Sequence, residues 1–182
     1  MLASTIILMT GLALTDPAPG AGEELREALP SLRGEWSGVL EYRDYRTNER
    51  VTLPHTRSVH VPPGADYVMS ALEFTDPGYV VYSAEVFVLD GETVSVGYTS
   101  SDGIDTDRLQ LISFSGDGGR WQAELTGETR DNGRDAEARY TYEVSVDTLN
   151  IVKAVRYSPD EDYVFRNGVR LQRVDAAQGE MQ

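Results

Sequence analysis

A period-two alternation of apolar and polar side chains runs from residue 34 to residue 174 and limits the folds that this chain can adopt. Turn-forming residues such as "TNE", "PPG", "GDGG" and "DNG" interrupt it at short intervals. Together they predict strands over 34–46, 50–61, 66–75, 79–89, 92–100, 107–115, 120–128, 136–146, 149–158 and 163–174. Because short turns join antiparallel neighbours, and each strand has one apolar face, the sequence predicts an all-β barrel or sandwich.

The alternation also predicts which side chains face inward. In 136–146 the apolar residues occupy the even positions, which indicates a half-buried strand. The same interpretation predicts these inward residues: Val80, Tyr82, Ala84, Val86 and Val88; Val94, Val96 and Tyr98; Trp121, Ala123 and Leu125; Ala136, Ala138, Tyr140, Tyr142, Val144 and Val146.

The first and last strands favour a barrel over a sandwich. In an even-numbered meander that closes on itself, the start of the first strand lies beside the end of the last. Trp36 would then meet Arg173, whose guanidinium can stack on the indole. Asp44 and Arg46 would lie at the opposite end, the mouth of the barrel. We therefore expect an antiparallel up-and-down barrel of about ten strands.

The opening "LRGEWSGVLEY", with Gly34-x-Trp36 on the first strand, a short helix before it and Arg173 ending the last strand, resembles the lipocalin-like barrels of the calycin superfamily. The resemblance is greatest to secreted bacterial lipocalin-like domains. It covers residues 25–174 as architecture, but only 32–54 and Arg173 as motif. It implies a barrel that is closed at one end and binds a small, usually apolar ligand through the other.

The first residues predict export. Residues 2–14 are apolar but too few to span a bilayer, and small residues follow, so we expect a signal peptide over 1–21 and a secreted or periplasmic protein. A buried N-terminal segment is the alternative. "GEELREAL", stopped by Pro30, predicts a short helix within a plug over 22–33. The barrel would occupy 34–174, and 175–182 would form a disordered tail.

The composition argues against several kinds of partner and site. The 16 Lys and Arg against 30 Asp and Glu give a net charge of −14, which disfavours nucleic acid and stable insertion in a membrane. The chain has no cysteine, so disulfides, thiol nucleophiles and thiolate metal sites are excluded. Lys153 is the only lysine.

A ten-stranded barrel is wider than the eight-stranded barrels whose interior is just filled, so we expect a cavity. Its predicted lining is rich in tyrosine, which supplies apolar area with a polar tip. The predicted lining residues are Tyr42, Tyr82, Tyr98, Tyr140, Tyr142 and Tyr157. The alternative is that these tyrosines fill the barrel and hydrogen-bond to one another or to water.

No motif predicts a catalytic residue, a metal or a cofactor. His55 and His60 are five residues apart on one strand, so they point to opposite faces and cannot share a metal ion. Haem-binding ten-stranded calycins take a histidine from the C-terminal part, where this chain has none, so haem is not expected. The acidic clusters match no calcium loop, and no Gly-x-Ser-x-Gly is present.

These observations favour a secreted module that binds a small hydrophobic or amphiphilic molecule. Two alternatives stay open. One is a calycin-type enzyme, isomerase- or hydrolase-like, which uses the same cavity and needs two titratable groups in it. The other is an accessory protein that acts through its outer surface, where Val39, Val81, Phe87 and Phe114 are predicted to be exposed apolar residues.

Overall fold

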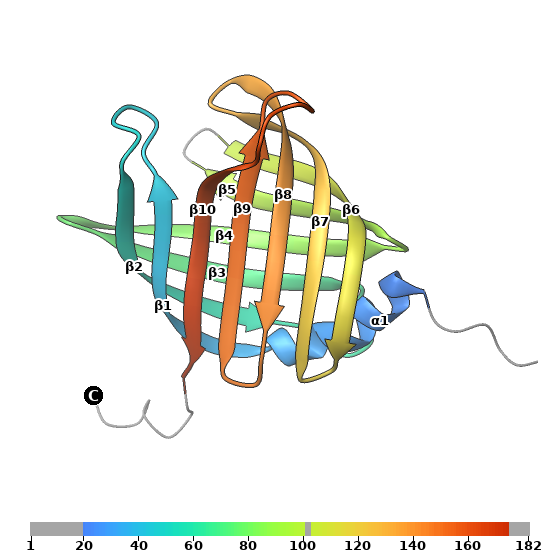
Figure 1. Cartoon of the computed structure of the whole chain (residues 1–182). Helices are drawn as coiled ribbons and strands as arrows, with labels where there is room; N and C mark the ends of the chain where they lie inside the picture. The colour runs from blue at the N-terminus through green and yellow to red at the C-terminus, as the bar shows by residue number, and fades with distance from the viewer. Residues whose placement is uncertain (1–19, 101–102, 175–182) are drawn as a thin grey trace, which may run out of the picture.

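The computed structural model describes residues 20–100 and 103–174, which form a closed antiparallel barrel with a short helix at one end (Figure 1). The helical segments are α1 (Ala21–Ala28) and η1 (Leu29–Leu32). The strands are β1 (Gly34–Arg43), β2 (Arg50–His60), β3 (Tyr67–Asp76), β4 (Tyr79–Asp90), β5 (Thr93–Ser100), β6 (Gly103–Asp117), β7 (Arg120–Asp131), β8 (Arg134–Val144), β9 (Thr148–Arg156) and β10 (Val164–Arg173). Each strand pairs with its neighbours in sequence, and β1 pairs with β10. The predicted ten-stranded up-and-down barrel is confirmed.

The barrel closes at a contact between Trp36 and Arg173. The two residues are partners in the β1–β10 register, and the Arg173 Cζ lies 4.1 Å from the centroid of the indole. The guanidinium also donates to the carbonyl oxygens of Ser31, Arg33 and Val146, at 2.7, 2.6 and 2.7 Å. One side chain therefore ties the first strand, the last strand, η1 and the β8–β9 turn together.

Gly34 of the Gly-x-Trp motif makes room for this contact. Its φ is +130°, and an added Cβ would lie 2.7 Å from a terminal nitrogen of Arg173. Any other residue at this position would strain the backbone and would clash with Arg173. The glycine, the tryptophan and the arginine thus form one structural unit.

The helical segments plug the end of the barrel where β1 begins (Figure 1). Leu25, Leu29 and Leu32 are buried in the same cluster as Trp36 and Trp121. Both indole nitrogens donate to the plug, that of Trp36 to the Leu32 carbonyl and that of Trp121 to the Ser31 hydroxyl, each at 2.9 Å. The plug is therefore held by hydrogen bonds as well as by apolar contact. We call this the closed end.

The turns β1–β2, β3–β4, β5–β6, β7–β8 and β9–β10 lie at the other end, which no helix covers among the described residues (Figure 1). We call this the open end. Within the described residues, no helix is long and apolar enough to cross a membrane. The predicted tail over 175–182, and nearly all of the predicted signal peptide, lie outside those residues.

The prediction of which β4 residues face the barrel interior is wrong. Ser83 and Glu85 line the interior and Phe87 and Leu89 are buried, whereas the even residues Val80, Tyr82, Ala84, Val86 and Val88 are exposed. Apolar residues occupy both faces of this strand, so alternation of hydrophobicity could not set its inward face. The same correction makes Phe87 a core residue rather than an exposed one.

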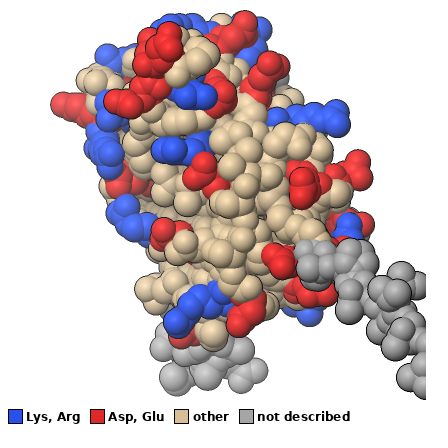
Figure 2. Space-filling view, turned by 45° about the vertical axis from the view of Figure 1, so that its right-hand side comes forward, with Lys and Arg blue, Asp and Glu red and all other residues tan. Residues whose placement is uncertain are grey.

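The outer surface combines scattered charges with an apolar area. Figure 2 shows acidic and basic side chains interspersed, with uncharged surface between them. On β3 and β4 the exposed Tyr67 is the partner of Val88, and the exposed Met69 is the partner of Val86. These four residues form a contiguous apolar group on the outside of the barrel.

Candidate ligand-binding cavity

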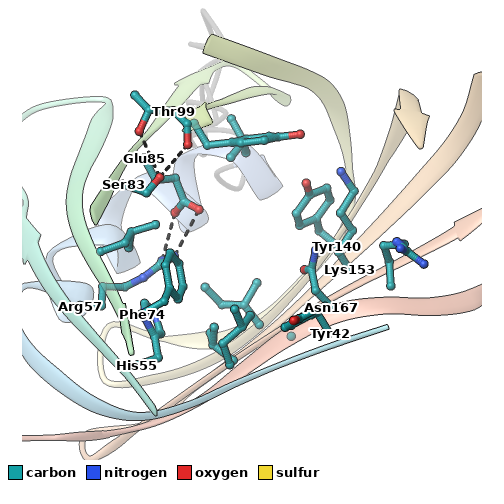
Figure 3. A pocket seen from close by; sticks show the side chains of 18 of the residues that line it. Tyr42, His55, Arg57, Phe74, Ser83, Glu85, Thr99, Tyr140, Lys153 and Asn167 are labelled. Carbon is teal, nitrogen blue, oxygen red and sulfur yellow. Dashed lines mark hydrogen bonds and ion pairs between the residues drawn. The ribbon is translucent and has the colours of Figure 1, made fainter. Parts of the chain in front are cut away.

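A cavity of about 370 Å³ occupies the barrel between its middle and the open end (Figure 3). At about 30 Å³ for each water molecule, it has room for roughly a dozen waters or a small organic molecule. Its wall combines aliphatic, aromatic and charged side chains from strands all round the barrel. The lining includes Leu40, Tyr42, Tyr45, His55, Arg57, Leu72, Phe74, Glu85, Val96, Tyr98, Tyr140, Tyr142, Ile151, Lys153, Arg166 and Val169.

The structure brings four of the six predicted tyrosines to this cavity: Tyr42, Tyr98, Tyr140 and Tyr142. Burial raises the pKa of Tyr98 and of Tyr142 far above the ordinary phenol value. These hydroxyls therefore stay protonated and keep a hydrogen to donate. Tyr98 and Tyr142 therefore add polar but uncharged groups to the cavity wall.

The other two predicted tyrosines lie elsewhere. Tyr82 is 75% exposed because it belongs to the outward face of β4, so its predicted place in the lining is wrong. Tyr157 follows β9 at the open end, where its hydroxyl donates to the Asp131 carboxylate. Its side chain lines a separate surface groove beside β7 and β8 rather than the cavity.

A buried network around Asp107 of β6, which sequence reasoning missed, borders the cavity through Tyr140 and Lys153. Asp107 accepts hydrogen bonds from Thr129 at 2.6 Å, from Tyr140 at 2.5 Å and from the Lys153 ammonium at 2.7 Å. All four residues are less than 10% exposed. The network joins β6, β7, β8 and β9 across the inside of the barrel and places one cationic group, the Lys153 Nζ, in the cavity wall.

The sequence held a signal for Lys153. It is the only lysine in a chain that has arginine at its fifteen other cationic positions. It also shares its alternation phase with Leu149, Ile151 and Val155, which are buried. A charged residue on the apolar face of a strand indicates an internal ion pair or a site. Asp107 gave no such signal, because apolar residues occupy both alternation phases of its segment, 107–115, so that the sequence does not indicate its inward face.

A second ion pair and the buried histidine face the network from β2 and β4 (Figure 3). Arg57 donates to both carboxylate oxygens of Glu85, at 3.0 and 3.2 Å. His55 is 1% exposed, and its ring stacks on Phe74 with centroids 4.6 Å apart. As predicted from their spacing, the two histidines face opposite ways, and His60 is exposed.

The His55 ring is neutral. Its Nδ1 is 2.9 Å from the carbonyl oxygen of Glu73, so the proton of the neutral ring lies on Nδ1. Burial first, and then the Arg57 charge, lower the His55 pKa to about 4, against the backbone contact to Glu73, which raises it. The Nε2 is therefore a lone-pair acceptor, and it has no hydrogen-bond partner among the described residues.

A third ion pair closes part of the open end. The Arg166 guanidinium lies 3.1 Å from the Asp131 carboxylate, and its Cζ is 3.4 Å from the centroid of the Tyr45 ring. The Tyr45 hydroxyl donates to Asp131 at 2.6 Å. Tyr45 thus fastens the β1–β2 turn to the end of β7, across the entrance.

The two residues predicted for the mouth lie in that turn, and the structure gives them different surroundings. The Asp44 carboxylate accepts from the backbone N–H of Arg46 and of Thr47, each at 2.8 Å, and these bonds lower its pKa. Asp44 therefore orders the turn. Arg46 is exposed and does not line the cavity.

Histidine and carboxylate groups in the described ranges, 20–100 and 103–174, form no cluster of three that could hold a metal ion. The internal cations instead each have a carboxylate partner, as the three pairs above show. The cavity thus presents tyrosine hydroxyls, one unpartnered imidazole nitrogen, paired charges and aliphatic surface to a molecule inside it.

Comparison with known proteins gives the fold and no more. No family model and no curated protein matches the chain. Among solved structures, it is similar to Rv2717c from Mycobacterium tuberculosis, with a TM-score of 0.58 and 15% sequence identity. The match covers 81% of this chain and 96% of that one. A barrel of this kind is compatible with ligand binding.

Proposed function

We propose that this protein is an exported, lipocalin-like member of the calycin superfamily that binds a small hydrophobic or amphiphilic molecule. The observation that carries the proposal is the 370 Å³ cavity, which lies next to the open end of the barrel and is lined by Tyr42, Tyr98, Tyr140 and Tyr142 together with aliphatic side chains. Such a wall supplies apolar area with a few oriented polar groups, as small-molecule sites do.

Binding fits the interior better than catalysis. Titratable groups do converge on the cavity, as the enzyme alternative requires. However, Arg57, Lys153 and Arg166 each contact a carboxylate, and these ion pairs hold the groups as structural partners. His55, with its pKa lowered to about 4, is a weak base. None of the groups is therefore suited to take a proton from a substrate at neutral pH.

The experiment is native mass spectrometry of the protein purified from its own host, with two matched variants on β9. Ile151 lines the cavity, whereas its neighbour Val152 points outward and is 38% exposed. Ile151→Trp should fill the cavity and remove the co-purified molecule, and Val152→Trp should retain it. A wild-type protein that carries no small molecule and takes up none from a panel of small aromatic and aliphatic compounds would overturn the proposal.

Export has its own test. Amino-terminal sequencing of the protein from its host should begin near residue 22, just before or within α1. A mature protein that retains Met1 and the apolar run over residues 2–14 would contradict export. That result would leave the cavity proposal unchanged.

The outer-surface alternative has one observation in its favour, the apolar group Tyr67, Met69, Val86 and Val88 on β3 and β4. Contiguous exposed apolar residues are typical of contact surfaces. If the surface rather than the cavity acts, Met69→Glu should abolish function in the host while Ile151→Trp has no effect. The cavity proposal expects the reverse.

A further inference from the structure

The charges inside the cavity are balanced. Three buried cations line it, and each has a carboxylate at ion-pair distance: Lys153 with Asp107 at 2.7 Å, Arg57 with Glu85 at 3.0 Å and Arg166 with Asp131 at 3.1 Å. The side chains of these three pairs are 20% exposed or less. A fourth lining cation, Arg130, is 73% exposed to solvent and lies 3.7 Å from the Asp135 carboxylate. A charged ligand would add a charge without an opposite partner in a poorly solvated space, and that is costly.

Two opposite walls of the cavity still offer a hydrogen-bonding group. On one wall, the Nε2 of His55 is a buried acceptor without a partner. On the other, the Lys153 ammonium has three hydrogens, donates to Asp107 at 2.7 Å and reaches Thr129 only at 3.5 Å. Figure 3 shows His55 beside Phe74 and Arg57 on one side, and Lys153 beside Tyr140 on the other.

A ligand that hydrogen-bonds to both groups needs a donor for His55 and an acceptor for Lys153. A ligand that donates a hydrogen bond to His55 satisfies an acceptor that is otherwise buried and unmatched. A carbonyl or ether oxygen at its other end can accept from Lys153 without disturbing the Asp107 pair. The flat Phe74 and His55 rings, stacked with 11° between their planes, suit an aromatic or otherwise flat body between the two ends.

We propose that the cavity selects uncharged molecules that carry a hydrogen-bond donor for His55 and an acceptor for Lys153, and that it rejects carboxylates of the same size. This inference rests on the proposed function, because it assumes that the cavity binds a small molecule. It names the class of that molecule from the charge balance, from the unpartnered His55 nitrogen and from the remaining hydrogens of the Lys153 ammonium.

The test is isothermal titration calorimetry at pH 7 with three probes of similar size. 4-Hydroxyacetophenone is uncharged and has a donor and an acceptor at opposite ends, 4-hydroxybenzoate replaces the ketone by a carboxylate, and 4-methoxyacetophenone lacks the donor. The wild-type protein should bind 4-hydroxyacetophenone at least about tenfold more tightly than either of the other two. These ratios need no variant, so they do not depend on whether a mutant folds.

Two variants test whether His55 causes the preference among these probes. In His55→Leu the preference for 4-hydroxyacetophenone over 4-methoxyacetophenone should disappear, whereas Tyr82→Phe on the outside of β4 should retain it. Equal or tighter binding of 4-hydroxybenzoate, or an unchanged preference in a folded His55→Leu variant, would overturn the inference. Both results would leave the proposed function intact, whereas binding of no probe, together with an empty protein from the host, would count against both.

Discussion

The two ends of this barrel are built from the same alternating strands but filled in opposite ways. At the closed end, α1 and η1 insert leucines between Trp36, Trp121 and Phe87, and the spaces that remain there are only about 20 and 10 Å³. Towards the open end the barrel contains a cavity of about 370 Å³, and its wall includes three ion pairs and a free imidazole nitrogen. The closed end is therefore a packed apolar core, whereas the open end holds the candidate ligand-binding cavity.

The difference shows how a barrel separates stability from binding. Close packing of apolar side chains stabilises the closed end mainly through burial of apolar area. The buried ion pairs towards the open end contribute less stability, because desolvation offsets much of their attraction. They do determine which side chains face the cavity and in what charge state. We expect four substitution experiments to test this division.

Trp36→Ala should lower the free energy of unfolding by about 3–5 kcal/mol, measured by urea denaturation. The substitution empties a fully buried site and removes both the stacking partner of Arg173 and the hydrogen bond to the Leu32 carbonyl. Arg46→Ala in the β1–β2 turn is the matched control at the open end. A loss below about 1 kcal/mol for Trp36→Ala would show that the closed end does not dominate stability.

Asp107→Ala should destabilise the protein by about 3 kcal/mol, because it leaves the Lys153 ammonium buried without a partner and removes the acceptor of Thr129 and Tyr140. The double variant Asp107→Leu with Lys153→Met should recover most of that stability, because no charge is then left unpaired. If the double variant is less stable than Asp107→Ala, the network is a main source of stability, and the contrast between the two ends fails.

His55 should make stability fall with decreasing pH. Its pKa is about 4 in the folded protein against 6.5 ordinarily, so the unfolded chain takes up a proton before the folded one does. The contribution of the neutral His55 ring to the free energy of unfolding is constant above pH 6.5. As the pH falls towards 4, about 2–3 kcal/mol of that contribution is lost. Comparing urea denaturation of the wild type and His55→Leu over this range isolates the effect, and identical pH profiles would contradict it.

Tyr82→Ser should change stability by less than about 0.5 kcal/mol and leave binding of 4-hydroxyacetophenone unchanged, because the side chain is 75% exposed on the outer face of β4. Tyr98→Phe, on the cavity wall, is the contrasting change and should alter binding. A large effect of Tyr82→Ser on the affinity would mean that the outer face of β4 communicates with the cavity.

Where alternation was clear, the sequence predicted the fold well. Ala138, Tyr140, Tyr142 and Val144 of β8 are buried as expected, because only one phase of that strand is apolar. β4 shows the limit, since both of its phases are apolar and the interior takes the one that includes Glu85. The candidate site was predicted only in part, because it depends on charged residues that make apolar faces look interrupted.

Period-two hydrophobicity and short turns leave few arrangements other than a closed meander of strands, so the amino-acid sequence predicts the barrel and the contact of Trp36 with Arg173. The contents of the open end become apparent only in the folded barrel. Asp107 and Lys153 are 46 residues apart in the chain, and Arg57 and Glu85 are 28 residues apart, so no local sequence pattern joins either pair. Burial drives such charges together across the barrel, and that pairing is visible only once the sheet has closed.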